Sequence, residues 1–103
     1  MDIRKVDLNL LVLFDEMSRL QSVNRAAEAM GLSQSATSGA LARLREMLGD
    51  PLFVRTGSGM LPTPKAQRLA PTVRRLVETI QTEVLHAPVF DPATARRQFT
   101  VLT

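Results

Sequence analysis

The chain has 103 residues, of which 45% are hydrophobic, and a formal net charge of +3. This length allows one small domain with a single modest core, and the hydrophobic share is typical of globular rather than disordered proteins. The sequence has no cysteine and one histidine, His86, which excludes a disulfide framework and leaves no set of thiolate or imidazole ligands, so we expect neither a metal nor a cofactor.

The N-terminal segment superficially resembles a secretory signal. Arg4 and Lys5 precede an apolar stretch over residues 8–14. Where a signal would then carry small cleavage-site residues, this chain has three charged ones, Asp15, Glu16 and Arg19. We therefore expect a cytoplasmic protein without an export signal or a membrane span.

Charge is unevenly distributed along the chain. Residues 17–76 contain nine bases and three acids, an excess of six positive charges. Such an excess is compatible with a nucleic-acid partner, but solvated helix faces often carry similar runs of bases. The charge alone therefore leaves both interpretations open.

Two helices are predicted near the N-terminus. Asp7 is a good N-cap, and apolar residues follow it at helical spacing, which predicts a helix that ends between residues 20 and 22. Asn24 is the expected N-cap of a second helix rich in strong helix formers, which Gly31 ends by adopting the left-handed conformation.

A third helix is predicted from Ser33, its N-cap, to Leu48, where Gly49 stops it. Two short helices joined by a tight glycine turn form a helix-turn-helix when the residues at their corner are small or apolar. Four residues satisfy that condition: Ala26, Ala27, Met30 and Leu32.

The third helix has two different faces at about 100° per residue. The face predicted to pack carries Ala36, Thr37, Ala40, Leu41, Leu44 and Leu48. The opposite face is small and uncharged, with Gln34, Ser35, Ser38, Gly39 and Ala42. Small polar side chains let a helix approach base edges in the major groove, where glutamine can read adenine and serine can reach bases or phosphates. The alternative is an ordinary solvated surface, although glycine inside a helix costs about 0.5 to 1 kcal/mol relative to alanine.

A two-stranded hairpin is predicted next. Residues 51–55 form a β-branched and aromatic run, residues 56–59 favour a turn, and Met60 and Leu61 follow before the Pro62-Thr63-Pro64 segment. Such a wing beside the helix-turn-helix can place an arginine in a minor groove, and Arg55 is the candidate. The alternative is a surface ion pair of Arg55 with Asp50 or Glu46.

The last predicted helix begins at Pro64 with Thr63 as N-cap and spans about 24 residues, or roughly 36 Å. A domain of this size cannot cover a helix of that length, so its distal apolar stripe needs a partner. A second copy of the same helix is the simplest partner, and burial against a further domain of the same chain is the alternative. The stripe predicted for dimerisation consists of Leu69, Val73, Leu76, Val77, Ile80 and Val84.

The ordered set of these segments resembles the N-terminal DNA-binding domain of LysR-type transcriptional regulators. The matching segments are residues 7–14, 22–27, 31–38, the pair Leu41 and Leu44, and residues 48–55. Residues 59–66 are similar to the branch that includes nodulation-gene activators and regulators of aromatic-compound degradation. The chain departs from the family's usual pattern at Ser35, Thr37 and Gly39, and we expect the missing side chain at Gly39 to shift discrimination toward DNA shape.

The resemblance implies a mainly α fold, a winged helix-turn-helix of three helices and a two-stranded β wing followed by a long dimerisation helix. It implies a winged helix-turn-helix at residues 1–63, a linker and dimerisation helix at 64–89, and a hinge with the start of an effector-binding domain at 90–103. The residues that it places on double-stranded DNA are Asn24, Arg25, Ser33, Gln34, Ser35, Ser38, Gly39, Arg55 and Thr63.

The function implied is that of a bacterial, nucleoid-associated regulator that binds a pseudo-palindromic promoter site as a dimer, and as a tetramer at full length. A small-molecule effector would act through the C-terminal domain. One rival is a winged helix that binds a polypeptide, which would lack the salt dependence of phosphate contacts. An enzyme is disfavoured because the sequence has no Ser-His-acid cluster, phosphate loop or metal-ligand set.

Overall fold

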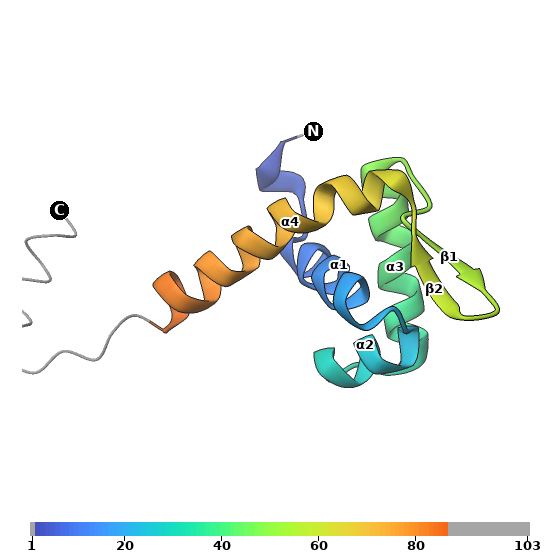
Figure 1. Ribbon diagram of the computed structural model, residues 1–103. Helices are drawn as coiled ribbons and strands as arrows, with labels where there is room; N and C mark the ends of the chain where they lie inside the picture. The colour runs from blue at the N-terminus through green and yellow to red at the C-terminus, as the bar shows by residue number, and fades with distance from the viewer. Residues whose placement is uncertain (1, 87–103) are drawn as a thin grey trace, which may run out of the picture.

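The computed structural model describes residues 2–86. Its elements are a 3₁₀ turn (η1, Ile3–Lys5), three helices (α1, Leu8–Leu20; α2, Val23–Met30; α3, Gln34–Leu48), two strands (β1, Phe53–Thr56; β2, Gly59–Pro62), and a long helix (α4, Pro64–Thr79) that continues as a π-helical segment (η2, Ile80–Leu85). Figure 1 shows the hairpin beside α3 and the distal half of α4 projecting away from the other helices. The predicted winged helix-turn-helix with a long final helix is confirmed.

Side-chain caps set where the helices begin. Ser33 Oγ accepts a hydrogen bond from the Ala36 amide at 3.0 Å, as predicted for the N-cap of α3. The prediction that Asn24 caps α2 was wrong, because Ser22 holds the extended conformation and its Oγ accepts from the Arg25 amide at 3.2 Å. Asn24 therefore lies within the first turn of α2, with its side chain exposed.

Helix α1 lies at the centre of the core. Leu13, Phe14 and Met17 are fully buried on it, and the Phe14 ring packs on Phe53 of β1 with centroids 5.5 Å apart. Thr37 of α3 is also fully buried, and its hydroxyl donates to the Ser33 carbonyl oxygen at 2.9 Å. Full burial of a large apolar side chain such as Leu13, Phe14 or Met17 stabilises the fold by about 1.5–3 kcal/mol.

Two predicted packing residues lie on the surface instead. Ala36 is exposed, and the Leu32 side chain is 41% exposed. The turn between α2 and α3 directs Leu32 outward, because the corner is already filled by Ala26 and Ala27, which are buried. Both Leu32 and Ala36 border a shallow hollow beside α1.

The antiparallel hairpin formed by β1 and β2 has the predicted position, with Arg55 opposite Met60. Arg45 of α3 fixes its base by donating to the carbonyl oxygens of Pro51 and Phe53, each at 2.8 Å. At the other end, the Met60 amide donates to the Gln21 carbonyl oxygen at 3.2 Å. The wing is therefore attached both to α3 and to the corner between α1 and α2.

The segment between α3 and the wing contains a buried residue in an unusual backbone conformation. Leu52 has φ of 62° and a fully buried side chain, so the burial offsets the strain. Asp50 Oδ2 accepts from the Leu52 amide at 2.8 Å and from Thr63 Oγ1 at 2.7 Å. These bonds, with the Thr63 hydroxyl contributing most, lower the pKa of Asp50 below its ordinary value.

Replacing Asp50 by asparagine is expected to make the fold less sensitive to acid. A carboxyl whose pKa is lowered by folding stabilises the protein above its unfolded pKa of about 3.9, and this contribution is lost as the pH falls through the folded value. The melting temperature of wild type should therefore exceed that of the Asp50→Asn variant near neutral pH, and the gap should narrow below about pH 4. Thermal melts followed by circular dichroism measure this, and a gap that is independent of pH would contradict it.

Helix α4 begins at the predicted residue and contains an internal proline. Thr63 caps it, Pro64 occupies its first turn as predicted, and Pro71 lies within it, where the missing amide leaves one helical hydrogen bond unmade. The helical segment ends at Leu85, and the predicted continuation to residue 89 and the hinge at 90–103 lie outside the described residues. Within residues 2–86, no helix is long and apolar enough to span a bilayer.

The predicted dimerisation stripe on α4 needs correction. Val73 is 7% exposed and belongs to the core, and Leu69 and Val77 are partly buried against the same cluster. Leu76 and Val84 are 42% and 66% exposed. The apolar residues of α4 therefore lie on two faces of the helix. The rest of the domain covers one face, and the other face is exposed.

Candidate nucleic-acid interface

The exposed edge of α3 is formed by its first turns. Gln34, Ser35, Ser38, Gly39 and Ala42 are all exposed, as the sequence predicted. The buried residues on the opposite side of α3 (Thr37, Ala40, Leu41 and Leu44) hold the helix against the core. We call the exposed set, residues 34, 35, 38, 39 and 42, the α3 edge. It has no charge and no side chain longer than glutamine.

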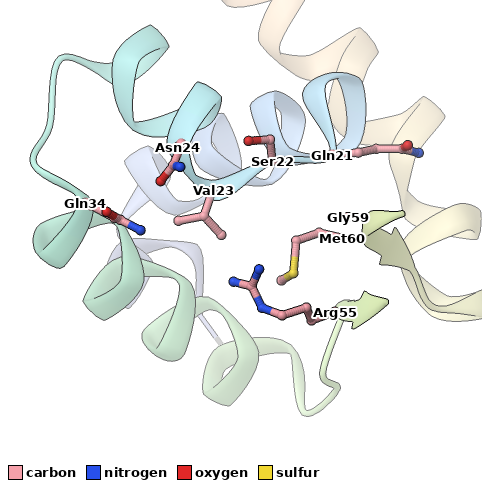
Figure 2. Close-up of a pocket in the computed structure, with 8 residues that line it drawn as sticks. All are labelled: Gln21, Ser22, Val23, Asn24, Gln34, Arg55, Gly59 and Met60. Carbon is pink, nitrogen blue, oxygen red and sulfur yellow. The ribbon is translucent and has the colours of Figure 1, made fainter. Parts of the chain in front are cut away.

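A shallow hollow separates the start of α3 from the wing. Figure 2 shows Gln34 at the left, the start of α2 with Asn24 above, and the Arg55 side chain extending from β1 into the space between them. Ser22 and Asn24 of α2 also line this hollow. The sequence placed Arg55 only in the wing, whereas the structure brings its guanidinium to the same hollow as Gln34.

The basic residues fall into two groups. Arg45 and Lys65 donate to backbone carbonyl oxygens, and Arg19 and Arg74 pair with carboxylates. Arg4 likewise pairs with Asp2. On the helix-turn-helix and wing, Arg25, Arg43 and Arg55 have no acidic partner among residues 2–86, and all three are exposed. The alternative pairing of Arg55 with Asp50 or Glu46 is thus not formed. Unpaired exposed guanidinium groups near an uncharged helix edge suit a polyanion.

Ser33 and Asn24 lie close to the α3 edge in different ways. The Ser33 Oγ accepts from the Ala36 amide, which leaves its hydroxyl hydrogen free to donate outward. Asn24 is exposed on α2 and lines the hollow described above. Ser22 also lines this hollow, and the sequence analysis did not select it. The N-cap preference of serine, which equals that of asparagine, is the signal that could have identified it.

Thr63 lies apart from the other predicted DNA-binding residues. Its hydroxyl donates to Asp50 and accepts from the Ala66 amide, so both roles are engaged within the domain. Lys65, two residues later, donates to the Leu48 carbonyl oxygen at 2.6 Å, which places this region at the C-terminal end of α3. Gln34 is at the other end of a 15-residue helix, roughly 20 Å away. Thr63 is therefore a structural cap and does not join the α3 edge.

Replacing Gly39 by alanine is expected to stabilise the isolated domain by about 0.5–1 kcal/mol, because alanine loses less backbone entropy in a helix. A Cβ at this position would meet only the Arg43 Nη1 atom at 3.8 Å, so nothing within the protein opposes it. Urea unfolding of the Gly39→Ala variant measures the change. A lower unfolding free energy would show that the helix is strained there.

Four helices with a hairpin wing, an uncharged α3 edge and unpaired arginines beside it define a winged helix-turn-helix of the nucleic-acid-binding kind. The sequence profile of the bacterial regulatory helix-turn-helix proteins of the lysR family matches residues 8–67. The chain belongs to the LysR family, and several of its relatives are named transcriptional activators or regulators rather than enzymes.

Two curated relatives show the branch. The chain is 46% identical over 101 residues to the transcriptional activator NahR of Pseudomonas putida, covering 98% of this chain and 34% of NahR. It is 42% identical over 101 residues to nodulation protein D 2 of Sinorhizobium fredii, covering 98% of this chain and 32% of that protein. The predicted similarity to the branch with nodulation-gene activators is confirmed, and the chain spans about a third of the length of these relatives.

The fold is shared with solved structures of the family. A probable transcriptional regulator from Pseudomonas aeruginosa superimposes with a TM-score of 0.79 at 38% sequence identity, over 91% of this chain and 32% of that chain. A TM-score of this size over 91% of the chain means that the two proteins share the fold.

Proposed function

We propose that this chain binds double-stranded DNA by placing the α3 edge in the major groove. The observation that carries the proposal is the exposed, uncharged edge from Gln34 to Gly39, with unpaired Arg55 in the hollow beside it and unpaired Arg25 exposed on the preceding helix α2. A smooth edge lets the helix come close to bases, and the flanking cations suit the phosphates along the groove.

The proposal assigns a contact to each exposed polar residue near the α3 edge. Gln34 is at the first turn of α3, where its amide can pair with adenine, while Ser35 and Ser38 reach neighbouring bases or phosphates. Ser33 and Asn24 are placed to donate to the phosphate backbone beside the helix. Arg55 serves the groove next to α3, with the adjacent minor groove as its target.

We further propose that two copies pair through distal α4. Leu76 and Ile80 line an apolar groove together with residues of the N-terminal turn and α1, namely Ile3, Val6, Leu8 and Leu11. Val84 extends the apolar surface along η2. An open apolar stripe of this length on a projecting helix is covered most simply by the same helix of a second copy. A two-fold dimer would then match a pseudo-palindromic site.

The whole protein would be a promoter-binding regulator in the bacterial nucleoid, with a small-molecule effector bound to a C-terminal domain and pairs of dimers forming tetramers. This is supported by the relatives, which are about three times longer than the chain and of which NahR is named a transcriptional activator.

Salt titration of duplex binding tests the proposal. Sites selected by the 103-residue chain from a random duplex library should bind with an affinity that falls steeply with salt, by about 1,000-fold between 50 and 200 mM if some six phosphates per dimer are contacted. Light scattering should give twice the mass of the chain. Salt-independent binding, or binding of peptides instead of duplexes, would overturn DNA binding, and a monomer mass would overturn the dimer.

Replacing Arg55 by alanine is expected to weaken binding to all duplexes alike and to reduce the salt slope by about one per copy. The reason is that an unpaired guanidinium at a groove edge contributes counterion release without reading a base. Fluorescence anisotropy at several salt concentrations measures both effects. Arg75→Ala is the matched control, because Arg75 is an exposed base on α4 without an acidic partner in the described residues. An unchanged salt slope for Arg55→Ala would contradict its role.

A further inference from the structure

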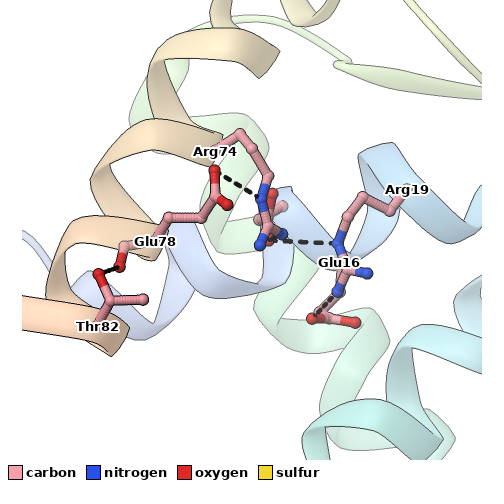
Figure 3. A network of polar contacts seen from close by, with 6 residues as sticks. Glu16, Arg19, Arg74, Glu78 and Thr82 are labelled. Carbon is pink, nitrogen blue, oxygen red and sulfur yellow. Dashed lines mark hydrogen bonds and ion pairs between the residues drawn. The ribbon is translucent and has the colours of Figure 1, made fainter. Parts of the chain in front are cut away.

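A buried carboxylate joins α1 to α4 in the part of the molecule away from the α3 edge. Asp15 is 3% exposed, and its Oδ2 accepts from Arg74 Nη1 at 2.7 Å and lies 3.5 Å from Arg19 Nε. Arg74 also lies 3.4 Å from Glu78 on its own helix, and Arg19 pairs with Glu16 on α1. Figure 3 shows Arg74 of α4 and Arg19 of α1 extending into the space between the two helices, where both interact with the carboxylate of Asp15. A buried carboxylate with directional partners fixes the orientation of both helices.

Arg74 lies just after an internal proline of α4. Pro71, three residues earlier, removes one hydrogen bond from the helix, so α4 can bend there more easily than elsewhere. The apolar contacts of Val73 and Val77 with the core hold α4 down but are non-directional. The Arg74–Asp15 hydrogen bond is directional, and it lies between Pro71 and the exposed apolar residues that begin at Leu76.

We infer that Asp15 and Arg74 are positioning residues that set the angle of distal α4 and, through it, the distance between the two recognition helices of a dimer. The inference rests on the proposed dimer. From Arg74 to Leu85 the helix extends roughly 15 Å, so a tilt of about 10° moves its end by roughly 3 Å, and two copies double the shift. Since successive base pairs are about 3.4 Å apart, such a shift changes the preferred half-site spacing by one to two base pairs.

The tilt of distal α4 is followed by the distance between two spin labels in the same copy of the chain. The chain has no native cysteine, so Glu28→Cys on α2 and Gln81→Cys on η2, both at exposed positions, give a spin-label pair, with unlabelled protein added in excess to remove distances between copies. The doubly labelled chain without a further change, which is the reference, and the same labelled chain with the control change Arg75→Gln should each give one narrow distance distribution. Arg74→Gln should broaden it, and Arg74→Lys, which keeps the charge, should restore part of the order. Asp15→Asn gives a second variant with nearly the same shape in the core.

The consequence for DNA is measured with duplexes in which the two half-sites are moved apart or together by one or two base pairs. Arg74→Gln should reduce the discrimination between spacings by about fivefold or more, with single half-site affinity unchanged. A distance distribution as narrow as that of the reference, or a broadened one with undiminished spacing discrimination, would overturn the inference while leaving DNA binding intact. Failure of wild type to bind any two-half-site duplex would instead overturn the proposed function and, with it, the spacing role.

Discussion

Replacing Phe53 by alanine is expected to lower the free energy of unfolding by about 3–5 kcal/mol. The Phe53 side chain is fully buried, and its ring lies against Phe14 with centroids 5.5 Å apart and an interplanar angle of 57°. Removing it opens a cavity between the wing and α1, in a domain whose total stability is of the order of 5–15 kcal/mol. Urea unfolding followed by circular dichroism is the suitable measurement, because the chain has neither tryptophan nor tyrosine.

The next residue supplies the control for this prediction. Val54 occupies the adjacent position on β1 and is 44% exposed, so Val54→Ala should change the unfolding free energy by less than about 1 kcal/mol. Equal losses from the two variants would mean that the strand, rather than the contact of Phe53 with Phe14, determines the stability. A large loss confined to Phe53→Ala would show that the wing is a part of the core.

The elements that the sequence predicted are those with local causes. Ser33 and Gly49 delimit α3 because a cap and a left-handed stop act through the chain's own neighbouring amides and carbonyls. The start of α2 was misplaced by two residues because Ser22 and Asn24 are both good caps, and propensity cannot choose between them. The two faces of α4 were merged because apolar periodicity does not reveal which part of a stripe meets α1.

The rest of the candidate site depends on residues that are distant in sequence. Arg55 and Gln34 line one hollow only because the Met60 amide and Arg45 attach the wing at both ends. The ion pair of Asp15 with Arg74 joins positions 59 residues apart, and no local pattern distinguishes these charges from solvated ones. Such contacts follow from the tertiary fold and are visible only once the helices are placed.

Replacing Gln34 by alanine is expected to cost about 1–3 kcal/mol of binding free energy on the preferred duplex and to relax the preference at one base pair per half-site. The Gln34 side chain is exposed and has no hydrogen-bond partner among residues 2–86, so the variant should fold as stably as wild type. Binding to a panel of duplexes, each with one base pair changed, measures the loss. Only the contacted pair should lose its discrimination.

Gln67 provides the matched comparison for this test. It is also exposed and in the first turn of its helix, but it is on α4, at the opposite end of the domain from Gln34. Gln67→Ala should leave every duplex bound as by wild type. If Gln34→Ala weakened all duplexes equally, its amide would contact phosphate instead of a base, and sequence preference would have to come from Ser35, Ser38 and the shape of the DNA.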